Sequence, residues 1–144
     1  MRSIECKKLA THIPTHTFSQ IFFNSRLCSI EKLTVYQKAK LFYKNTNNLL
    51  IQGKTIGYVI TNSVETGGFV PLNIAEGTSR YSKADRRNFY IISRGSVFEC
   101  VAIFDILKEE GMLPVEQFQR FYKDSEELSK MLFAMIQQLD GKGK

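Results

Sequence analysis

A long heptad pattern in the last third of the chain constrains the fold more than any other feature. From Val115 to Leu139, apolar and small residues recur at steps of three and four, which alternate from Phe118 onward. This spacing is typical of a helix that packs one face against another helix. Pro114 suits the first turn, because the amide that proline lacks would have no helical partner there. Gly141 ends the pattern. The recurring residues are Val115, Phe118, Phe121, Ser125, Leu128, Leu132, Met135 and Leu139.

A second long helix is predicted directly before this one, from Lys83 to about Glu110. Ser82 suits its N-cap, with Asp85 three residues later as in a capping box, and Gly111 suits its C-terminal stop. Only the short link "GMLP" separates the two helices, so we expect them to pack antiparallel. The apolar stripe consists of Phe89, Ile92, Ser96, Cys100, Ile103 and Leu107, widened by Tyr90, Val97, Val101 and Phe104.

Two further helices are predicted nearer the N-terminus. The first lies within residues 29–53 and the second covers about residues 54–79. The second pattern is weaker, because two glycines and Pro71 disfavour a helix interior; we interpret it as a helix that kinks near Pro71. The first helix has one face made of Tyr36, Ala39, Tyr43, Thr46 and Leu50.

These patterns together predict one all-α domain. We expect an antiparallel up-down four-helix bundle over residues 29–140, with a kinked second helix. Residues 1–28 show no sustained period, so they are interpreted as a poorly defined N-terminal arm, whether a short helix, extended or disordered. Residues 141–144 read as a flexible tail.

The net charge of +6 is unevenly distributed along the chain. Residues 1–98 contain 14 Lys/Arg against 5 Asp/Glu (+9), whereas residues 99–144 contain 6 against 9 (−3). Such asymmetry favours an acidic partner, nucleic acid above all, although a solvated helix face is the alternative. The basic residues are densest at Arg80, Lys83, Arg86, Arg87 and Arg94, which we name the basic rim.

Composition argues against several classes of protein. No apolar run approaches the roughly 20 residues of a membrane span, so we expect no membrane partner. Three widely spaced cysteines, Cys6, Cys28 and Cys100, do not form a disulfide framework, which favours a reducing cytoplasm. Cys100 falls in the middle of an apolar stripe and is interpreted as a small core residue.

The usual catalytic and metal-binding patterns are absent or weak. There is no glycine-rich phosphate loop. His12 and His16 are four residues apart, with Cys6 nearby, but Pro14 between them argues against a helical metal site. Both histidines precede the bundle, which leaves none for general base catalysis there. We therefore expect no enzyme activity, no cofactor and no metal.

The motif "PLNIAEGTSRYSKADRRNF" connects the second and third helices. Asn73 and Glu76 lie one helical turn apart. They are interpreted as a buried polar pair that fixes the kink after Pro71, with a ligand-binding pair as the alternative. Gly77 is expected to end its helix in a left-handed conformation. Glu99 is predicted to face the core with Arg80 or Arg94 as its partner, the sharper alternative being a general acid in a cleft.

This motif resembles that of the four-helix bundle family also called the 23S rRNA intervening-sequence proteins. The family pattern is a proline, Asn-Ile-Ala-Glu-Gly, Arg-x-Ser and, about a dozen residues later, Gly-Ser and a Glu. "LTVYQKA" resembles the family's opening and "LSKMLFAMIQQL" its last helix, so that the likeness covers about residues 31–139. "ETGG" replaces the usual basic, Ala-rich turn before the proline. The matching residues are Pro71, Asn73, Ile74, Ala75, Glu76, Gly77, Arg80, Ser82, Gly95, Ser96 and Glu99.

The resemblance implies a non-enzymatic bundle that assembles as a ring-like homopentamer. It also implies association with nucleic acid, either RNA or DNA, for which the basic rim is the expected surface. Similar bundles are accessory proteins of diversity-generating retroelements, where the partners are nucleic acid and a reverse transcriptase. A protein-interaction scaffold or accessory subunit is therefore the alternative to a nucleic-acid-binding protein.

Overall fold

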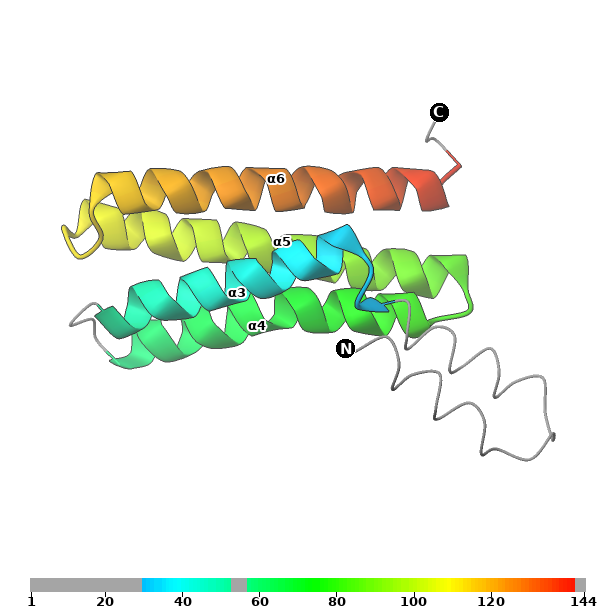
Figure 1. The fold of residues 1–144 in the computed structure, drawn as a ribbon, viewed down its shortest axis with the longest axis horizontal. Helices are drawn as coiled ribbons and strands as arrows, with labels where there is room; N and C mark the ends of the chain where they lie inside the picture. Colours follow the sequence, from blue (N-terminus) through cyan, green and yellow to red (C-terminus); the bar gives the residue numbers. More distant parts are fainter. Residues whose placement is uncertain (1–29, 53–56, 142–144) are drawn as a thin grey trace.

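Four helices form the part of the chain that the computed structural model describes, residues 30–52 and 57–141. They are α3 (Thr34–Gln52), α4 (Gly57–Ser79), α5 (Lys83–Glu109) and α6 (Val115–Leu139) (Figure 1). These residues contain no strand. The predicted all-α, four-helix fold is thereby confirmed, whereas the arm expected over residues 1–28 lies outside the described residues.

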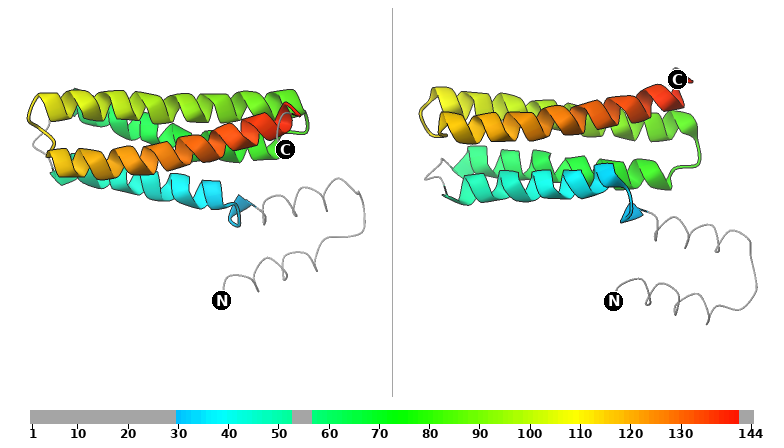
Figure 2. Two further views of the ribbon diagram at one scale, coloured as in Figure 1. Left: turned by 90° about the horizontal axis from the view of Figure 1, so that it is seen from above. Right: turned by 45° about the horizontal axis from the view of Figure 1, so that its top comes forward.

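The helices lie side by side along the long axis of the molecule (Figures 1 and 2). α5 packs against both α4 and α6, and α3 packs against α4 and, less extensively, α6. Ser93 of α5 donates a hydrogen bond to the Val70 carbonyl of α4 at 2.9 Å, and Tyr90 approaches Gly77. Higher residue numbers on α4 thus meet lower numbers on α5.

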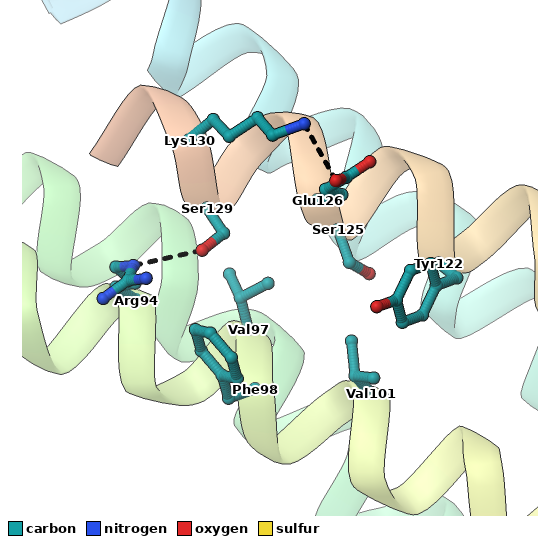
Figure 3. Close-up of a pocket in the computed structure, with 9 residues that line it drawn as sticks. All are labelled: Arg94, Val97, Phe98, Val101, Tyr122, Ser125, Glu126, Ser129 and Lys130. Atoms are coloured by element: carbon teal, nitrogen blue, oxygen red, sulfur yellow. Dashed lines mark hydrogen bonds and ion pairs between the residues drawn. The ribbon is translucent and has the colours of Figure 1, made fainter. Parts of the chain in front are cut away.

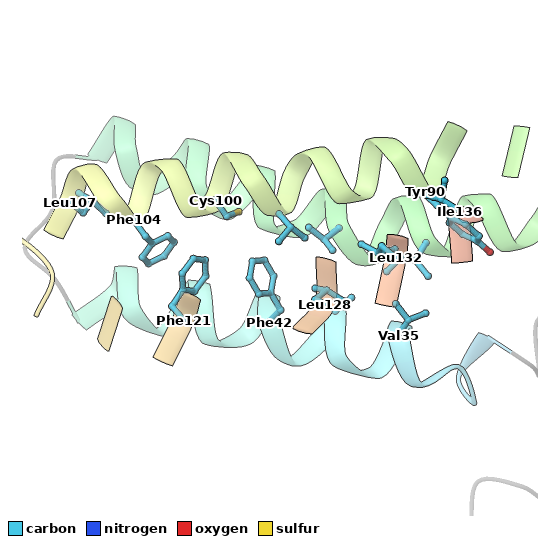
Figure 4. Packing of buried hydrophobic residues seen from close by; sticks show 14 of the residues in the cluster. Val35, Phe42, Tyr90, Cys100, Phe104, Leu107, Phe121, Leu128, Leu132 and Ile136 are labelled. Carbon is cyan, nitrogen blue, oxygen red and sulfur yellow. The ribbon is translucent and has the colours of Figure 1, made fainter. Parts of the chain in front are cut away.

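Aromatic side chains from three helices fill one end of the core (Figure 4). The Phe121 ring of α6 stacks on Phe104 of α5 at 4.1 Å between ring centroids and lies 5.1 Å from Phe42 of α3. Towards the other end, Leu128, Leu132 and Ile136 of α6 continue the core. Fully burying each such side chain is worth about 1.5–3 kcal/mol, so this core stabilises the bundle substantially.

The helix ends follow the local signals in the sequence. The Ser82 hydroxyl accepts a hydrogen bond from the Asp85 amide at 3.4 Å and caps α5. Gly111 and Gly141 have φ angles of 69° and 72°, the left-handed conformation that terminates a helix at low cost for glycine. The predicted N-cap of α5 and the predicted stops of α5 and α6 are confirmed.

Gly77 does not end its helix, which makes one prediction from the motif wrong. It lies inside α4 rather than at a left-handed helix end, since only the two glycines above have positive φ among the described residues. A Cβ at Gly77 would meet Cε1 of Tyr90 at 2.8 Å and Cβ of Phe89 at 3.0 Å. The motif requires glycine here because α4 and α5 approach too closely for a side chain.

α4 continues through Pro71 as one helix of 23 residues. Proline removes one intrahelical hydrogen bond and usually bends a helix. The kink at Pro71 stays a prediction.

The buried face of α5 differs in phase from the predicted stripe. Ser93 is buried, whereas Ile92, which we placed in the stripe, is 51% exposed. The buried residues are Tyr90, Ser93, Ser96, Val97, Cys100, Phe104 and Leu107. The core therefore takes up the part of α5 that α4 and α6 both cover. Val101 and Ile103 pack at the margin of this core, whereas the exposed apolar residues of α5 are Ile91, Ile92, Phe98 and Ile106.

Candidate functional site

The basic rim begins where α4 turns into α5. The Arg80 guanidinium forms an ion pair with Glu76, four residues before it, and lies 4.8 Å from the centroid of the Phe89 ring. Both partners of the ion pair are about half exposed. A surface pair of this kind contributes little to stability, but it places the Arg80 charge at the corner of the bundle.

Asn73 and Glu76 do not form the pair predicted from their spacing. Nδ2 of Asn73 donates to the Phe69 carbonyl at 2.8 Å, whereas Glu76 binds Arg80. The carbonyl that Pro71 leaves without an amide is four residues earlier, at Gly67, so Asn73 does not cap that group. Asn73 is half-buried and Glu76 exposed, which corrects the expectation of a buried polar pair.

Arg86 is turned inward at the corner rather than outward. Its Nη2 donates to the Arg80 carbonyl at 2.8 Å, and its Nε is buried without a hydrogen-bond partner among the described residues. Arg86 thus ties the start of α5 to the end of α4. Of the five rim residues, it is the least suited to contact an external partner.

Arg87 and Arg94 both reach from α5 to α6. Nε of Arg87 lies 2.6 Å from Oδ1 of Asp140, just beyond the end of α6. Nε of Arg94 donates to the Ser129 hydroxyl at 3.1 Å. Lys83, four residues before Arg87, is exposed and forms no ion pair within the described ranges. The three cations therefore line the seam between α5 and α6.

A cleft of about 270 Å³ opens between α5 and α6 beside Arg94 (Figure 3). Apolar side chains of α5 form one wall, and hydroxyl and charged side chains of α6 form the other. Sequence analysis missed this cleft, because the heptad rule singles out the buried positions of α6 and not the exposed ones beside them. Its lining residues are Arg94, Val97, Phe98, Val101, Tyr122, Ser125, Glu126, Ser129 and Lys130.

Two aromatic rings hold the Arg94 guanidinium. Its central carbon lies 5.1 Å from the centroid of the Phe98 ring and 5.2 Å from that of Phe133. Cation–π contacts of this kind stabilise a charged group without neutralising it. Arg94 therefore keeps its positive charge and a defined position at the cleft.

Glu99 does not face the core as predicted. It is exposed, and neither Arg80 nor Arg94 is paired with it. Ser96 is buried, as its place in the predicted stripe suggested, and its hydroxyl donates to the Ile92 carbonyl within the same helix at 3.3 Å. Ile92, Glu99 and Ile106 follow at steps of seven, with Gly95 and Ala102 between them, and all five are exposed. We name these five residues the outer seam of α5.

Cys100, the neighbour of Glu99, is fully buried, which confirms its place in the core. Burial raises the pKa of its thiol to about 12, and the nearby Glu99 carboxylate adds to the shift. The thiol is therefore protonated at neutral pH and is a poor nucleophile. This residue has a packing role.

The described helices offer no metal-binding cluster of three or more His, Cys, Asp or Glu side chains. The pattern of Cys6, His12 and His16 lies outside the described residues. Within those same ranges, no helix is both long and apolar enough to cross a bilayer.

Comparison with known proteins agrees with the motif. The family model for the 23S rRNA-intervening sequence protein matches residues 31–134, nearly the whole of the four-helix region. No curated protein is significantly similar to the chain. The match extends through α3, α4 and α5 and over most of α6. On the strength of this match, the chain belongs to the 23S rRNA-intervening sequence protein family.

Proposed function

We propose that this protein is a non-enzymatic, oligomeric helical bundle that binds RNA or DNA through the basic face of α5. The observation that carries the proposal is the row of Lys83, Arg87 and Arg94 along one face, extended at the corner by Arg80. Such a row attracts phosphate groups with little dependence on sequence. The charge of +9 in the first 98 residues supports the same partner.

The outer seam of α5 supports the oligomeric part of the proposal. Ile92 and Ile106 are 51% and 59% exposed, and no neighbouring group among the described residues lies within 4 Å of a Cβ placed at Gly95. Small residues between apolar ones let a second helix approach closely, and an exposed heptad seam calls for a partner surface. We propose a homo-oligomer, and a pentamer is the number that the family resemblance favours.

A binding titration at two salt concentrations tests the nucleic-acid partner. Labelled RNA and DNA oligonucleotides are titrated with the wild-type protein and with the Lys83→Ala/Arg87→Ala variant. Each lost phosphate contact lowers the slope of log affinity against log salt by about one, so we expect a slope smaller by about two and weaker binding. Unchanged affinity and slope in this variant would overturn the proposal.

The matched control is Lys44→Ala/Lys123→Ala, which removes the same charge from exposed positions on α3 and α6. Both side chains lack ion-pair partners among the described residues. We expect this variant to retain most of the affinity. If both double variants lose binding equally, net charge rather than the face of α5 is responsible.

A protein-interaction scaffold, for example an accessory subunit of a reverse transcriptase, is the second candidate. It is favoured by the internal contacts of the rim: Arg80 binds Glu76, Arg86 binds a carbonyl, and Arg87 binds Asp140. These contacts leave fewer donors for phosphate. Absence of salt-dependent binding to any nucleic acid, with the oligomer intact, would favour this candidate.

Light scattering tests self-association. One chain has a mass of 16.6 kDa, so an oligomer at micromolar concentration is readily distinguished from a monomer. We expect Ile106→Asp to shift the assembly towards monomer, because it places a charge in the outer seam. A monomeric wild-type protein would contradict the oligomer.

A further inference from the structure

The cleft between α5 and α6 has the features of a site for one planar ring. Val97 and Val101 form its apolar wall, and the Phe98 and Tyr122 rings flank it from opposite helices (Figure 3). Phe98 is 55% and Tyr122 50% exposed. Two large aromatic side chains left half in water at one cleft are suited to stacking on a ligand.

The size of the cleft limits what can enter. Its volume of about 270 Å³ lies just below the roughly 300–1,000 Å³ that is usual for sites of drug-sized ligands. One flat ring system fits such a volume. The polar side chains at the cleft, Tyr122, Ser129 and Lys130, could provide hydrogen bonds to the edge of a ring that carries nitrogen and oxygen atoms.

The charge beside the cleft indicates that the ring is attached to an anionic chain. Arg94 stands at the cleft, and Lys83 and Arg87 precede it by 11 and 7 residues on the same helix. At 1.5 Å per residue, this row is about 16 Å long. A row of cations that ends beside exposed aromatic rings matches the way in which proteins hold single strands, with phosphates along a basic groove and bases stacked on rings.

A duplex does not fit this arrangement. Its bases are paired and stacked inside the helix, so a base could reach Phe98 only after it was unstacked, which costs a few kcal/mol. A single strand already presents its bases. The basic face and the cleft together therefore favour a single strand over a duplex.

From the exposed Phe98 and Tyr122 rings beside the Lys83–Arg87–Arg94 row, we propose that the cleft takes one base of a single-stranded nucleic acid. This inference rests on the proposed nucleic-acid binding and adds to it the strandedness and the stacking residues. The base stacks between the two rings, while Arg94 holds the adjacent phosphate. The preference is for single strands, with little dependence on base identity, because every base has a π-face.

The test compares a single-stranded oligonucleotide with one of the same length whose nucleotides are abasic. Both have the same phosphate charge, so only stacking distinguishes them. Loss of stacking on one base lowers affinity on the order of tenfold, so we expect the wild-type chain to bind the normal strand about tenfold more tightly than the abasic strand. In the Phe98→Leu/Tyr122→Leu variant, which keeps apolar side chains, we expect the ratio to fall towards one. Equal wild-type affinity for the two strands would overturn the inference.

A second measurement keeps the test valid if the double variant folds poorly. The chain contains no tryptophan, so the fluorescence of 2-aminopurine placed in the strand can be followed without interference. We expect quenching on binding to the wild-type protein and a lower affinity for the matching duplex. If binding depends on salt but shows neither quenching nor a preference for single strands, the inference about the cleft is refuted and the proposed nucleic-acid binding stands. Absence of binding to every oligonucleotide refutes the proposed function as well, and a protein side chain then becomes the better occupant of the cleft.

Discussion

The two faces of α5 both carry apolar side chains at heptad spacing, but their surroundings differ. The inner face contains Val97, Cys100 and Phe104, which are at most 1% exposed. The outer seam repeats with the same heptad spacing, yet Ile92 and Ile106 are more than half exposed. Heptad periodicity therefore shows that a helix has packing faces, whereas the neighbouring helices determine which face is filled within one chain.

The largest expected difference between the faces concerns Phe104 and Ile106. Phe104→Ala removes a fully buried ring that stacks on Phe121, and we expect the free energy of unfolding to fall by about 3–5 kcal/mol. Ile106→Ala should change it by less than about 0.5 kcal/mol under conditions where the chain is monomeric. Urea denaturation of both variants measures the difference. Similar losses would mean that the outer seam is also packed.

Gly77 and Gly95 provide the next comparison. Gly77→Ala should destabilise the protein by about 1–3 kcal/mol, since the new methyl group would overlap the Tyr90 ring. The methyl group of Gly95→Ala would meet no neighbour within 4 Å in the described part of the chain, so this change should stabilise the single chain by about 0.5–1 kcal/mol through helix propensity. Thermal unfolding should therefore show a lower melting temperature for Gly77→Ala and a higher one for Gly95→Ala than for the wild-type protein. If Gly95→Ala also dissociates the oligomer, the outer seam is the interface.

The buried Cys100 thiol on the inner face of α5 makes the free energy of unfolding depend on pH. Its pKa is about 12 in the folded chain against a model value of 9.0, mainly because of burial. Below pH 9 both states hold the proton, and above it the unfolded state releases the proton first, so stability falls as pH rises towards 12. We expect Cys100→Ala to flatten this decline by up to about 1.4 kcal/mol per pH unit. An identical alkaline slope in the variant would contradict the shift.

The smallest expected effect is at Glu99. Because this side chain is exposed and unpaired among the described residues, Glu99→Gln and Glu99→Leu should each change the free energy of unfolding of a monomer by less than about 0.5 kcal/mol. A buried, paired carboxylate would make the leucine variant far less stable than the glutamine variant. Glu99→Leu should nevertheless strengthen self-association if the outer seam is the interface, which light scattering can measure.

Much of the corner between α4 and α5 was predictable, but its contacts were not. Ser82 was predicted as a cap because capping depends on neighbouring residues alone. Gly77 was misread because left-handed helix ends and close helix approach both select glycine, and the second depends on Tyr90, 13 residues later. Arg87 and Arg94 were singled out by the density of basic charge, but their partners Asp140 and Ser129 lie just after and within α6, which is distant in sequence.

The sequence by itself determined the all-α class, the lengths and ends of α5 and α6, the family and the concentration of basic charge before residue 99. Periodicity, caps and composition are local properties, so they can be read without coordinates. Only the tertiary structure decided that Ser93 rather than Ile92 faces the core, that Glu99 faces outward and that a cleft lies beside Arg94. Adjacent positions on a helix differ by only about 100°, and packing against α4 and α6 determines which of two apolar faces is buried.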